Sequence, residues 1–144
     1  MSDRAVWTFF YGSYLNPAVL AEVDLRPQVW ETARLGGFEL VISPRANLRP
    51  ASGCVAFGIV AQVTHAELDR LYAHAEDVLG QVYLPEAVLV STFDHRSLPA
   101  LCYVCTDMAP APAEADYVDR ILEPCRQYGF PEWYLKHIAS FRPS

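Results

Sequence analysis

Blocks of apolar and polar positions follow one another along the chain, and they predict a mixture of strands and helices. Apolar runs typical of β-strands occupy residues 5–10, 53–63, 82–92 and 100–106, and a longer extended segment at 29–43 is interrupted at Gly36 and Gly37. Residues 43–52 are polar and bounded by prolines, which predicts a loop. Several strands follow one another without a helix between them, so a regular alternation of strand and helix is excluded.

Helical periodicity occurs in four places. Residues 17–22 predict a short helix with Asn16 as its N-cap and a proline at its first position. Thr64 and Glu67 form a capping box, which apolar residues at helical spacing follow. Residues 113–125 and 131–141 predict two further helices. The expected fold class is α+β in one domain over residues 1–144, with a small sheet or barrel of about five or six strands and three or four helices.

Composition and charge narrow the classes of function. Hydrophobic residues make up 52% and charged residues 19% of the chain, as expected of a globular protein. The net charge of −6 argues against a basic, phosphate-binding surface and therefore against nucleic-acid binding. No apolar run approaches the ~18 residues of a membrane span, and the first residues lack a leader's apolar core, so we expect a cytoplasmic protein. Most of the four cysteines lie in apolar stretches, which favours reduced, buried thiols.

Glu76 is a candidate for proton transfer on physical grounds. An advance of about 100° per residue from Leu68 places Glu76 about 80° away, at the border of the apolar stripe of its helix. A carboxylate at such a border, next to Tyr72 and Ala75, is partly desolvated, and its pKa is raised. The alternative is that Glu76 is an ordinary solvated residue at a helix end, and periodicity alone favours that alternative.

Two other kinds of catalytic site fit the sequence poorly. His74 and Glu76, with Pro124 and Cys125, resemble part of the H-x-E and P-C-x-x-C pattern of zinc deaminases, but Tyr128 stands in place of the second cysteine. Zinc would therefore have too few ligands. A serine or cysteine nucleophile is also weakly supported, because no G-x-S-x-G turn is present. We expect neither a metal ion nor an organic cofactor.

The strand at residues 5–10 ends abruptly at Tyr11, Gly12 and Ser13. Such a turn frees backbone N–H groups, and glycine lets a ligand approach the main chain closely. These amides would suit a carboxylate ligand, and a plain structural turn is the alternative.

Four segments together resemble the γ-glutamylcyclotransferase-like family. Residues 9–15 (FFYGSYL) resemble its strand followed by YGSNL, and residues 46–50 (ANLRP) with 55–60 (VAFGIV) resemble its mid-chain pattern with a small displacement. The segment 68–76, followed by Tyr83, resembles the helix-borne glutamate and following tyrosine. Residues 110–141 resemble the helical tail, so the resemblance spans residues 6–141.

The resemblance implies a cofactor-free enzyme with a barrel-like mixed sheet flanked by helices. In this family the α-amino group of a γ-glutamyl compound attacks its own γ-amide carbonyl, which releases an amine and 5-oxoproline. By resemblance Glu76 is the general acid/base, and the residues that hold the substrate are Tyr11, Gly12, Ser13, Tyr14, Leu15 and Tyr83. The implied partner is a small γ-glutamyl amino acid, peptide or amine, with no nucleic acid or membrane, and the protein is expected to be a monomer or a homodimer.

Three positions depart from the family pattern. Tyr14 replaces the asparagine of YGSN, Asp77 replaces the usual glycine after the glutamate, and Met108 stands where a tyrosine often follows the last strand. Asp77 adds a second negative charge beside the proposed base. These departures leave the substrate open and motivate a rival hypothesis, a non-catalytic member that binds a small ligand or a protein in the same cavity. The sequence assigns no role to Arg45, Glu39 and Glu86.

Overall fold

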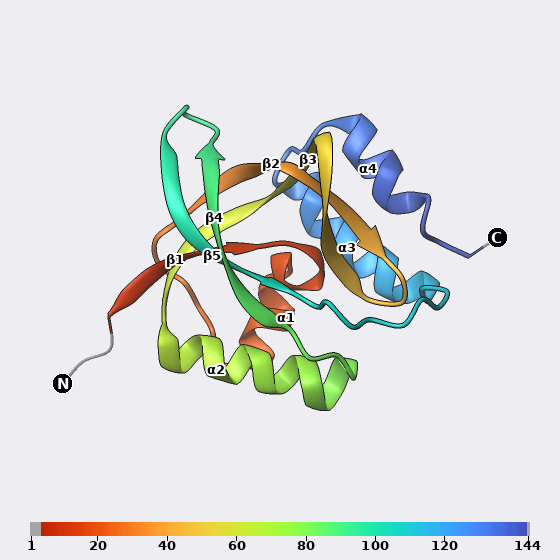
Figure 1. Cartoon of the computed structure of the whole chain (residues 1–144), viewed down its shortest axis with the longest axis horizontal. Helices are drawn as coiled ribbons and strands as arrows, with labels where there is room; N and C mark the ends of the chain where they lie inside the picture. The colour runs from red at the N-terminus through yellow and green to blue at the C-terminus, as the bar shows by residue number, and fades with distance from the viewer. Residues whose placement is uncertain (1–3, 144) are drawn as a thin grey trace.

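A computed structural model describes residues 4–143 and contains five strands and four α-helices. The strands are β1 (Ala5–Phe10), β2 (Trp30–Ile42), β3 (Ala46–Thr64), β4 (Leu84–Thr92) and β5 (Ser97–Val104). The helices are α1 (Pro17–Glu22), α2 (His65–His74), α3 (Ala115–Gln127) and α4 (Glu132–Ala139), and two single turns accompany them, a 3-10 turn at Gly12–Leu15 and a π-helical turn at Ala75–Leu79. The predicted α+β class is confirmed (Figure 1).

The strands close into a barrel in the order β1-β3-β2-β4-β5. Neighbouring strands are antiparallel except β1 and β5, which pair in parallel through Thr8 and Leu101. The β2–β3 hairpin is the longest element, and its register shifts at a bulge between Gly36 and Phe38, where the sequence predicted an interruption. The barrel is therefore a mixed sheet, as expected.

One sequence-based boundary is wrong. The segment 43–52 was expected to be a loop, but Ala46 pairs with Ile42 and residues 46–50 continue β3 into the hairpin. Ala46 and Leu48 are buried while Asn47 is only half-buried, so the segment alternates between two faces as a strand does. Its polar residues and its proline concealed this alternation in the sequence.

The barrel strands approach closely where β1 meets β3. A Cβ atom added to Gly58 would lie 2.1 Å from the Phe10 carbonyl oxygen and 2.9 Å from the Phe9 ring. Both phenylalanines are fully buried. Glycine is therefore required at this position, because any side chain would push β1 away from β3.

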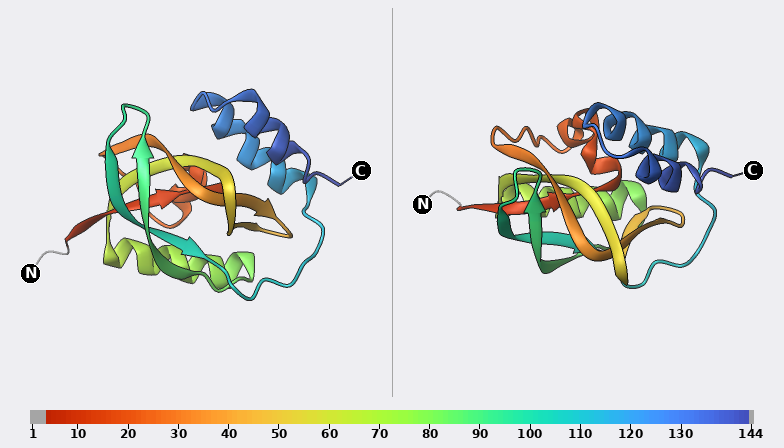
Figure 2. Two further views of the ribbon diagram at one scale, coloured as in Figure 1. Left: turned by 45° about the horizontal axis from the view of Figure 1, so that its top comes forward. Right: turned by 90° about the horizontal axis from the view of Figure 1, so that it is seen from above.

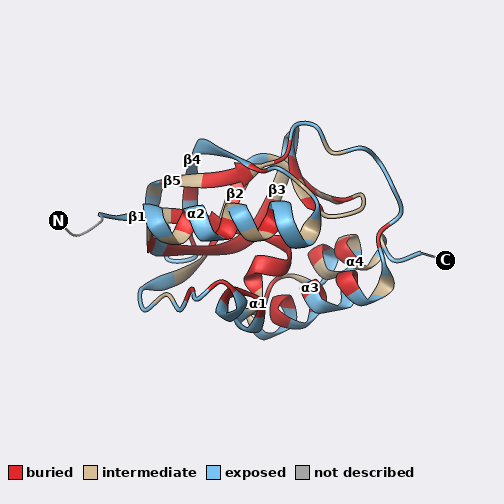
Figure 3. Ribbon diagram, turned by 90° about the horizontal axis from the view of Figure 1, so that it is seen from below, coloured by how far each residue is buried: buried red, intermediate tan, exposed pale blue. Residues whose placement is uncertain are grey.

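The helices lie on two sides of the barrel. The capping box predicted for α2 is present, because the Glu67 amide donates to Thr64 Oγ1 at 3.1 Å and the Thr64 amide donates to Glu67 Oε1 at 2.8 Å. Leu68 and Leu71 pack into the core, and the outward surface of α2 is mostly exposed (Figure 3). Helices α3 and α4 pack together on the other side, with α1 between them and α2 (Figure 2). None of the described helices has the length and apolarity needed to cross a bilayer.

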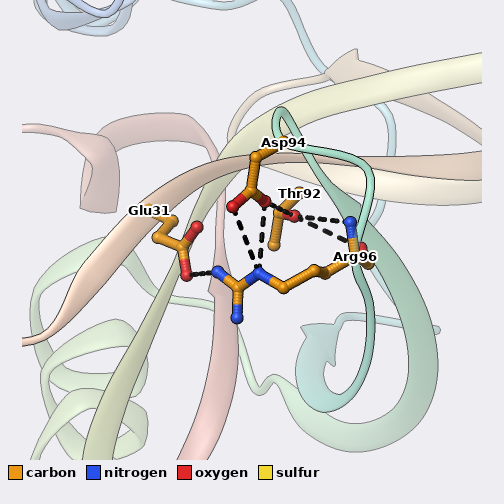
Figure 4. A network of polar contacts seen from close by, with 4 residues as sticks. All are labelled: Glu31, Thr92, Asp94 and Arg96. Atoms are coloured by element: carbon orange, nitrogen blue, oxygen red, sulfur yellow. Dashed lines mark hydrogen bonds and ion pairs between the residues drawn. The ribbon is translucent and has the colours of Figure 1, made fainter.

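A polar network fixes the turn between β4 and β5 (Figure 4). Arg96 contacts Glu31 of β2 and donates from Nε to Asp94 at 3.2 Å. The Thr92 hydroxyl donates to Asp94, and the Thr92 amide donates to the Arg96 carbonyl at 2.8 Å. The network therefore ties the hairpin tip to the neighbouring strand.

Candidate functional site

The turn after β1 is buried and closely packed. Gly12 has a φ angle of +67°, and a Cβ atom added to it would lie 2.4 Å from the Cβ atom of Ala46. Ser13 is 7% exposed. The turn packs against α1, α3 and β3. The first backbone N–H groups of this helical turn have no acceptor within the turn itself, as at every helix start.

Two stacked tyrosines anchor the beginning of this turn. The Tyr11 and Tyr103 rings lie 4.5 Å apart at 13°. The Tyr103 hydroxyl accepts from the Tyr11 amide at 2.8 Å and donates to the Tyr11 carbonyl at 2.6 Å, while the Tyr11 hydroxyl donates to the Tyr103 carbonyl at 2.6 Å. Burial raises the pKa of both hydroxyls well above the ordinary value. Tyr11 is thus engaged in holding the turn.

Ala46 is the second fixed point beside the turn. Its amide donates to the Tyr117 hydroxyl at 2.9 Å, and its carbonyl accepts from the Tyr83 hydroxyl at 2.5 Å. The neighbouring Asn47 side chain donates to the Cys105 carbonyl at 2.7 Å and accepts from the Cys105 amide at 3.0 Å. The mid-chain segment therefore positions the start of β3 against the turn.

A cavity of about 110 Å³ lies beside Ser13. Its lining comes from the turn, α1, the β2–β3 turn, the end of α2 and α3. The lining residues are Ser13, Val19, Glu22, Arg45, His74, Val78, Leu79, Tyr117 and Arg120. Segments more than a hundred residues apart in the chain thus line one cavity.

Charged groups surround this cavity. The Arg45 guanidinium lies over the Tyr117 ring, 4.8 Å from its centroid, and Arg120 contributes a second cation. Glu22 is the one acidic residue among the described residues that line the cavity. The combination of two cations and one carboxylate suits a ligand that carries both a carboxylate and an ammonium group.

His74 links the buried turn to the cavity's carboxylate. The distance between the Tyr14 hydroxyl and His74 Nδ1 is 3.0 Å, and that between His74 Nε2 and Glu22 Oε2 is 3.3 Å. Burial raises the pKa of the Tyr14 hydroxyl, which therefore keeps its proton. The Glu22 carboxylate can only accept, so His74 Nε2 carries a proton and donates to it, and Nδ1 of the neutral ring accepts from the Tyr14 hydroxyl.

The predicted binding residues play different structural parts. Ser13 lines the cavity, and Tyr14 reaches it through His74. Leu15 is buried in the core. Tyr83 is 5% exposed, and its hydroxyl is engaged with Ala46. A direct contact between Tyr83 and a ligand remains a prediction.

The structure places Glu76 outside the cavity. Glu76 is exposed in the π-helical turn, whereas His74 and Val78 line the cavity. Val78 follows Glu76 by about 200° on an ideal helix, so the two side chains point to roughly opposite sides. The expectation of a half-sheltered carboxylate is therefore wrong. An apolar stripe has two borders, and the cavity lies at the border opposite the one that Glu76 occupies.

Sequence reasoning missed the charged lining of the cavity. Glu22, Arg45 and Arg120 come from three elements and match no local motif. The one sequence signal for this site was Tyr14, which departs from the family's YGSN pattern. Its partner His74 lies 60 residues away in the chain. Among the described residues, no group of three or more His, Cys, Asp or Glu side chains is arranged to hold a metal ion.

Comparisons with known proteins identify the fold. A family model described as the AIG2-like family matches residues 55–138. An uncharacterized protein from Homo sapiens superposes with a TM-score of 0.84 at 21% identity, over 99% of this chain and 90% of that chain. A γ-glutamyl cyclotransferase gives 0.76 at 22% identity over 97% and 89% of the two chains. A γ-glutamyl cyclotransferase from yeast, specific to glutathione, gives 0.65 at 13% identity over 96% of each. No curated protein matches significantly.

Proposed function

The chain belongs to the AIG2-like family, and we propose that its cavity beside Ser13 binds a small γ-glutamyl compound and cyclises it to 5-oxoproline. The observation that carries the proposal is the cavity itself, where two arginines and one glutamate meet the turn after β1. The γ-glutamyl cyclotransferases of similar fold support the reaction class. The proposed partner is therefore a small molecule.

The charges of the cavity complement a glutamyl head group. In the proposed complex Arg45 and Arg120 pair with the α-carboxylate, and Glu22 pairs with the α-ammonium group; all three residues line the cavity. The volume of about 110 Å³ corresponds to about four molecules of liquid water. Such a cavity suits the head group of an amino acid, while the leaving amine extends through the mouth.

The proposed reaction requires that the substrate be held in a cyclising shape and that a protein group transfer protons. Nucleophile and electrophile belong to one molecule, so holding it in its cyclising shape supplies effective concentration. The amides of Gly12 and Ser13 are the proposed donors to the oxyanion that forms at the γ-carbonyl. A carboxylate accelerates proton transfer about 10²–10⁴-fold. By resemblance this carboxylate is Glu76, but Glu76 is exposed and does not line the cavity.

The test is release of 5-oxoproline from a panel of γ-glutamyl dipeptides, glutathione and γ-glutamylamines. We expect turnover of at least one compound, with Arg45→Gln raising KM about tenfold or more through loss of a charged contact. Arg49→Gln is the matched control, because Arg49 pairs with Glu39 at 2.8 Å outside the cavity. A panel that yields no 5-oxoproline would overturn the enzymatic proposal.

A non-catalytic binding function is the second candidate, and one observation favours it. Glu76, the residue assigned to proton transfer by resemblance, is exposed and does not line the cavity. In that case a γ-glutamyl compound raises the melting temperature without being consumed, because a ligand that binds only the folded state stabilises it. Loss of this shift in Arg45→Gln would locate the binding in the cavity.

A further inference from the structure

We infer that Glu22, rather than Glu76, is the acid/base residue of the cavity, and that His74 and Tyr14 position its carboxylate. The inference rests on the proposed cyclisation. Glu22 ends α1 and lines the hollow next to Ser13, whereas Glu76 is exposed on the other side of the π-helical turn.

The location of Glu22 is the first argument. A general base must lie within hydrogen-bonding reach of the proton that it removes. Glu22 is the one carboxylate among the described cavity-lining residues. Its side chain is 56% exposed, so a ligand in the cavity can contact it directly. A carboxylate in the last turn of a helix is also electrostatically disfavoured, so helix stability does not account for it.

The connection to His74 is the second argument. The His74 side chain is 11% exposed, lines the same cavity and lies 3.3 Å from the Glu22 carboxylate. The Tyr14 hydroxyl contacts Nδ1 at 3.0 Å, and Nε2 donates to the Glu22 carboxylate, which can only accept. A ring fixed at both nitrogens holds the carboxylate in one orientation, as the partner of a catalytic group does.

Charged and polar groups from three elements surround the His74–Glu22 pair. The groups that face the His74–Glu22 pair are Tyr14 from the turn, Arg45 from the β2–β3 turn, and Tyr117 and Arg120 from α3. The ionised carboxylate of Glu22 is the form that accepts a proton from the ligand.

The proton balance of the proposed step closes without a further reactant. Glu22 takes one proton from the α-ammonium group, and the freed nitrogen forms a bond to the γ-carbonyl carbon. The Glu22 carboxylic acid then gives its proton to the leaving nitrogen as the amide C–N bond breaks. The second proton lost by the attacking nitrogen passes to the released amine, which leaves as an ammonium ion. The ring nitrogen of 5-oxoproline retains one proton.

The experiment compares three glutamate-to-glutamine variants on the compound with the fastest 5-oxoproline release. We expect Glu22→Gln to lower kcat about 10²-fold or more, because the general acid/base is lost. Glu76→Gln and the control Glu86→Gln, which alters an exposed residue of β4, should retain wild-type turnover. Melting temperatures report folding, and Glu22→Asp, which keeps the carboxylate, should retain part of the activity.

Variants of the positioning residues distinguish orientation from mere packing. His74→Leu should lower kcat about tenfold with little change in KM, because one hydrogen bond to the carboxylate is lost. His74→Gln keeps an N–H donor and should recover most of that loss. Equal losses in His74→Leu and His74→Gln would contradict the positioning role of His74.

The outcomes separate this inference from the proposed function. If Glu22→Gln retains wild-type turnover and Glu76→Gln has none, the inference about Glu22 is overturned, but the proposed cyclisation is still supported. Failure of the wild-type protein to release 5-oxoproline from every compound would overturn both.

Discussion

Two tight turns in this molecule share a backbone feature and differ in their surroundings. Gly12, after β1, has a φ angle of +67°, and His95, between β4 and β5, has one of +69°. The first turn is buried beneath helices and touches Ala46, whereas His95 is exposed at the hairpin tip. The left-handed conformation alone therefore does not demand glycine. At Gly12 the lack of space demands it.

The polar contacts of the two turns differ in the same way. Neutral tyrosine hydroxyls, buried with their backbone partners, hold the first turn, while charged side chains in water hold the second (Figure 4). A buried polar group that loses its partner is not rehydrated, but an exposed charge is. The contacts of the first turn should thus be the more costly to remove, and the unfolding free energies of matched variants test this.

Gly12→Ala should have the largest effect, with a loss of about 3–5 kcal/mol in the free energy of unfolding. The new Cβ atom combines left-handed strain with the 2.4 Å contact to the Ala46 Cβ atom. Urea denaturation measures the loss. Gly37→Ala is the matched control, because Gly37 has a φ angle of +84° and no atom lies within 4 Å of its added Cβ. It should lose only about 1–2 kcal/mol.

The double variant Gly12→Ala/Ala46→Gly sharpens this comparison. Removing the Ala46 methyl group opens the space that the new side chain needs, so part of the loss should return. If the double variant loses as much unfolding free energy as the two single variants together, contact with Ala46 does not cause the loss in Gly12→Ala.

Tyr103→Phe should have the next largest effect, a loss of about 2–4 kcal/mol. The Tyr103 hydroxyl satisfies both the amide and the carbonyl of Tyr11, which is 1% exposed, and each orphaned buried group costs about 1–3 kcal/mol. Tyr128→Phe is the control, because its half-buried hydroxyl makes one bond, to the Leu15 carbonyl at 3.1 Å. Equal losses of unfolding free energy in the two variants would contradict the importance of burial.

The unfolding free energy should also fall as the pH rises above about 9. Burial raises the pKa of the Cys102 and Cys125 thiols from 9.0 to about 12. Above pH 9 the unfolded chain loses these protons while the folded chain keeps them, so stability is full below pH 9 and declines as the pH approaches 12. Each thiol should contribute a loss of about 1–2 kcal/mol by pH 10. Cys125→Ala should make the unfolding free energy fall less steeply with pH above 9. An unchanged pH dependence would show that the Cys125 thiol does not contribute to it.

Local signals accounted for much of the fold. Asn16 accepts from the Ala18 amide at 3.0 Å, and the Thr64–Glu67 capping box forms as the sequence predicted. Both caps depend on residues within one turn of a helix, so they can be predicted from the local sequence. Residues 46–50 were misassigned because their strand character depends on pairing with Phe38–Ile42, which no local pattern reveals.

The site was less predictable, because its polar residues are brought together by the tertiary fold. Ser13 was identified from its turn, but Glu22 and Arg120 lie in helices whose sequences show only ordinary surface charges. Glu76 was placed from an ideal helical wheel, and such a wheel locates the core without locating a cavity. The same limitation concealed His74, whose partner Tyr14 lies in another element.

Arg96→Ala should have the smallest effect, because the Arg96 and Asp94 side chains are 50% and 62% exposed. Thr92 and Arg96 lower the pKa of Asp94 through hydrogen bonds, so the network stabilises the fold above the ordinary carboxyl pKa and its contribution is lost as the pH falls below about 4. Salt should weaken the contribution, since the Debye length falls to about 3 Å at 1 M. We therefore expect wild type and Arg96→Ala to differ slightly at pH 7 in low salt, and to converge both in 1 M salt and below pH 4. A loss of unfolding free energy as large as that of Tyr103→Phe, unaffected by salt, would remove the distinction between the two turns.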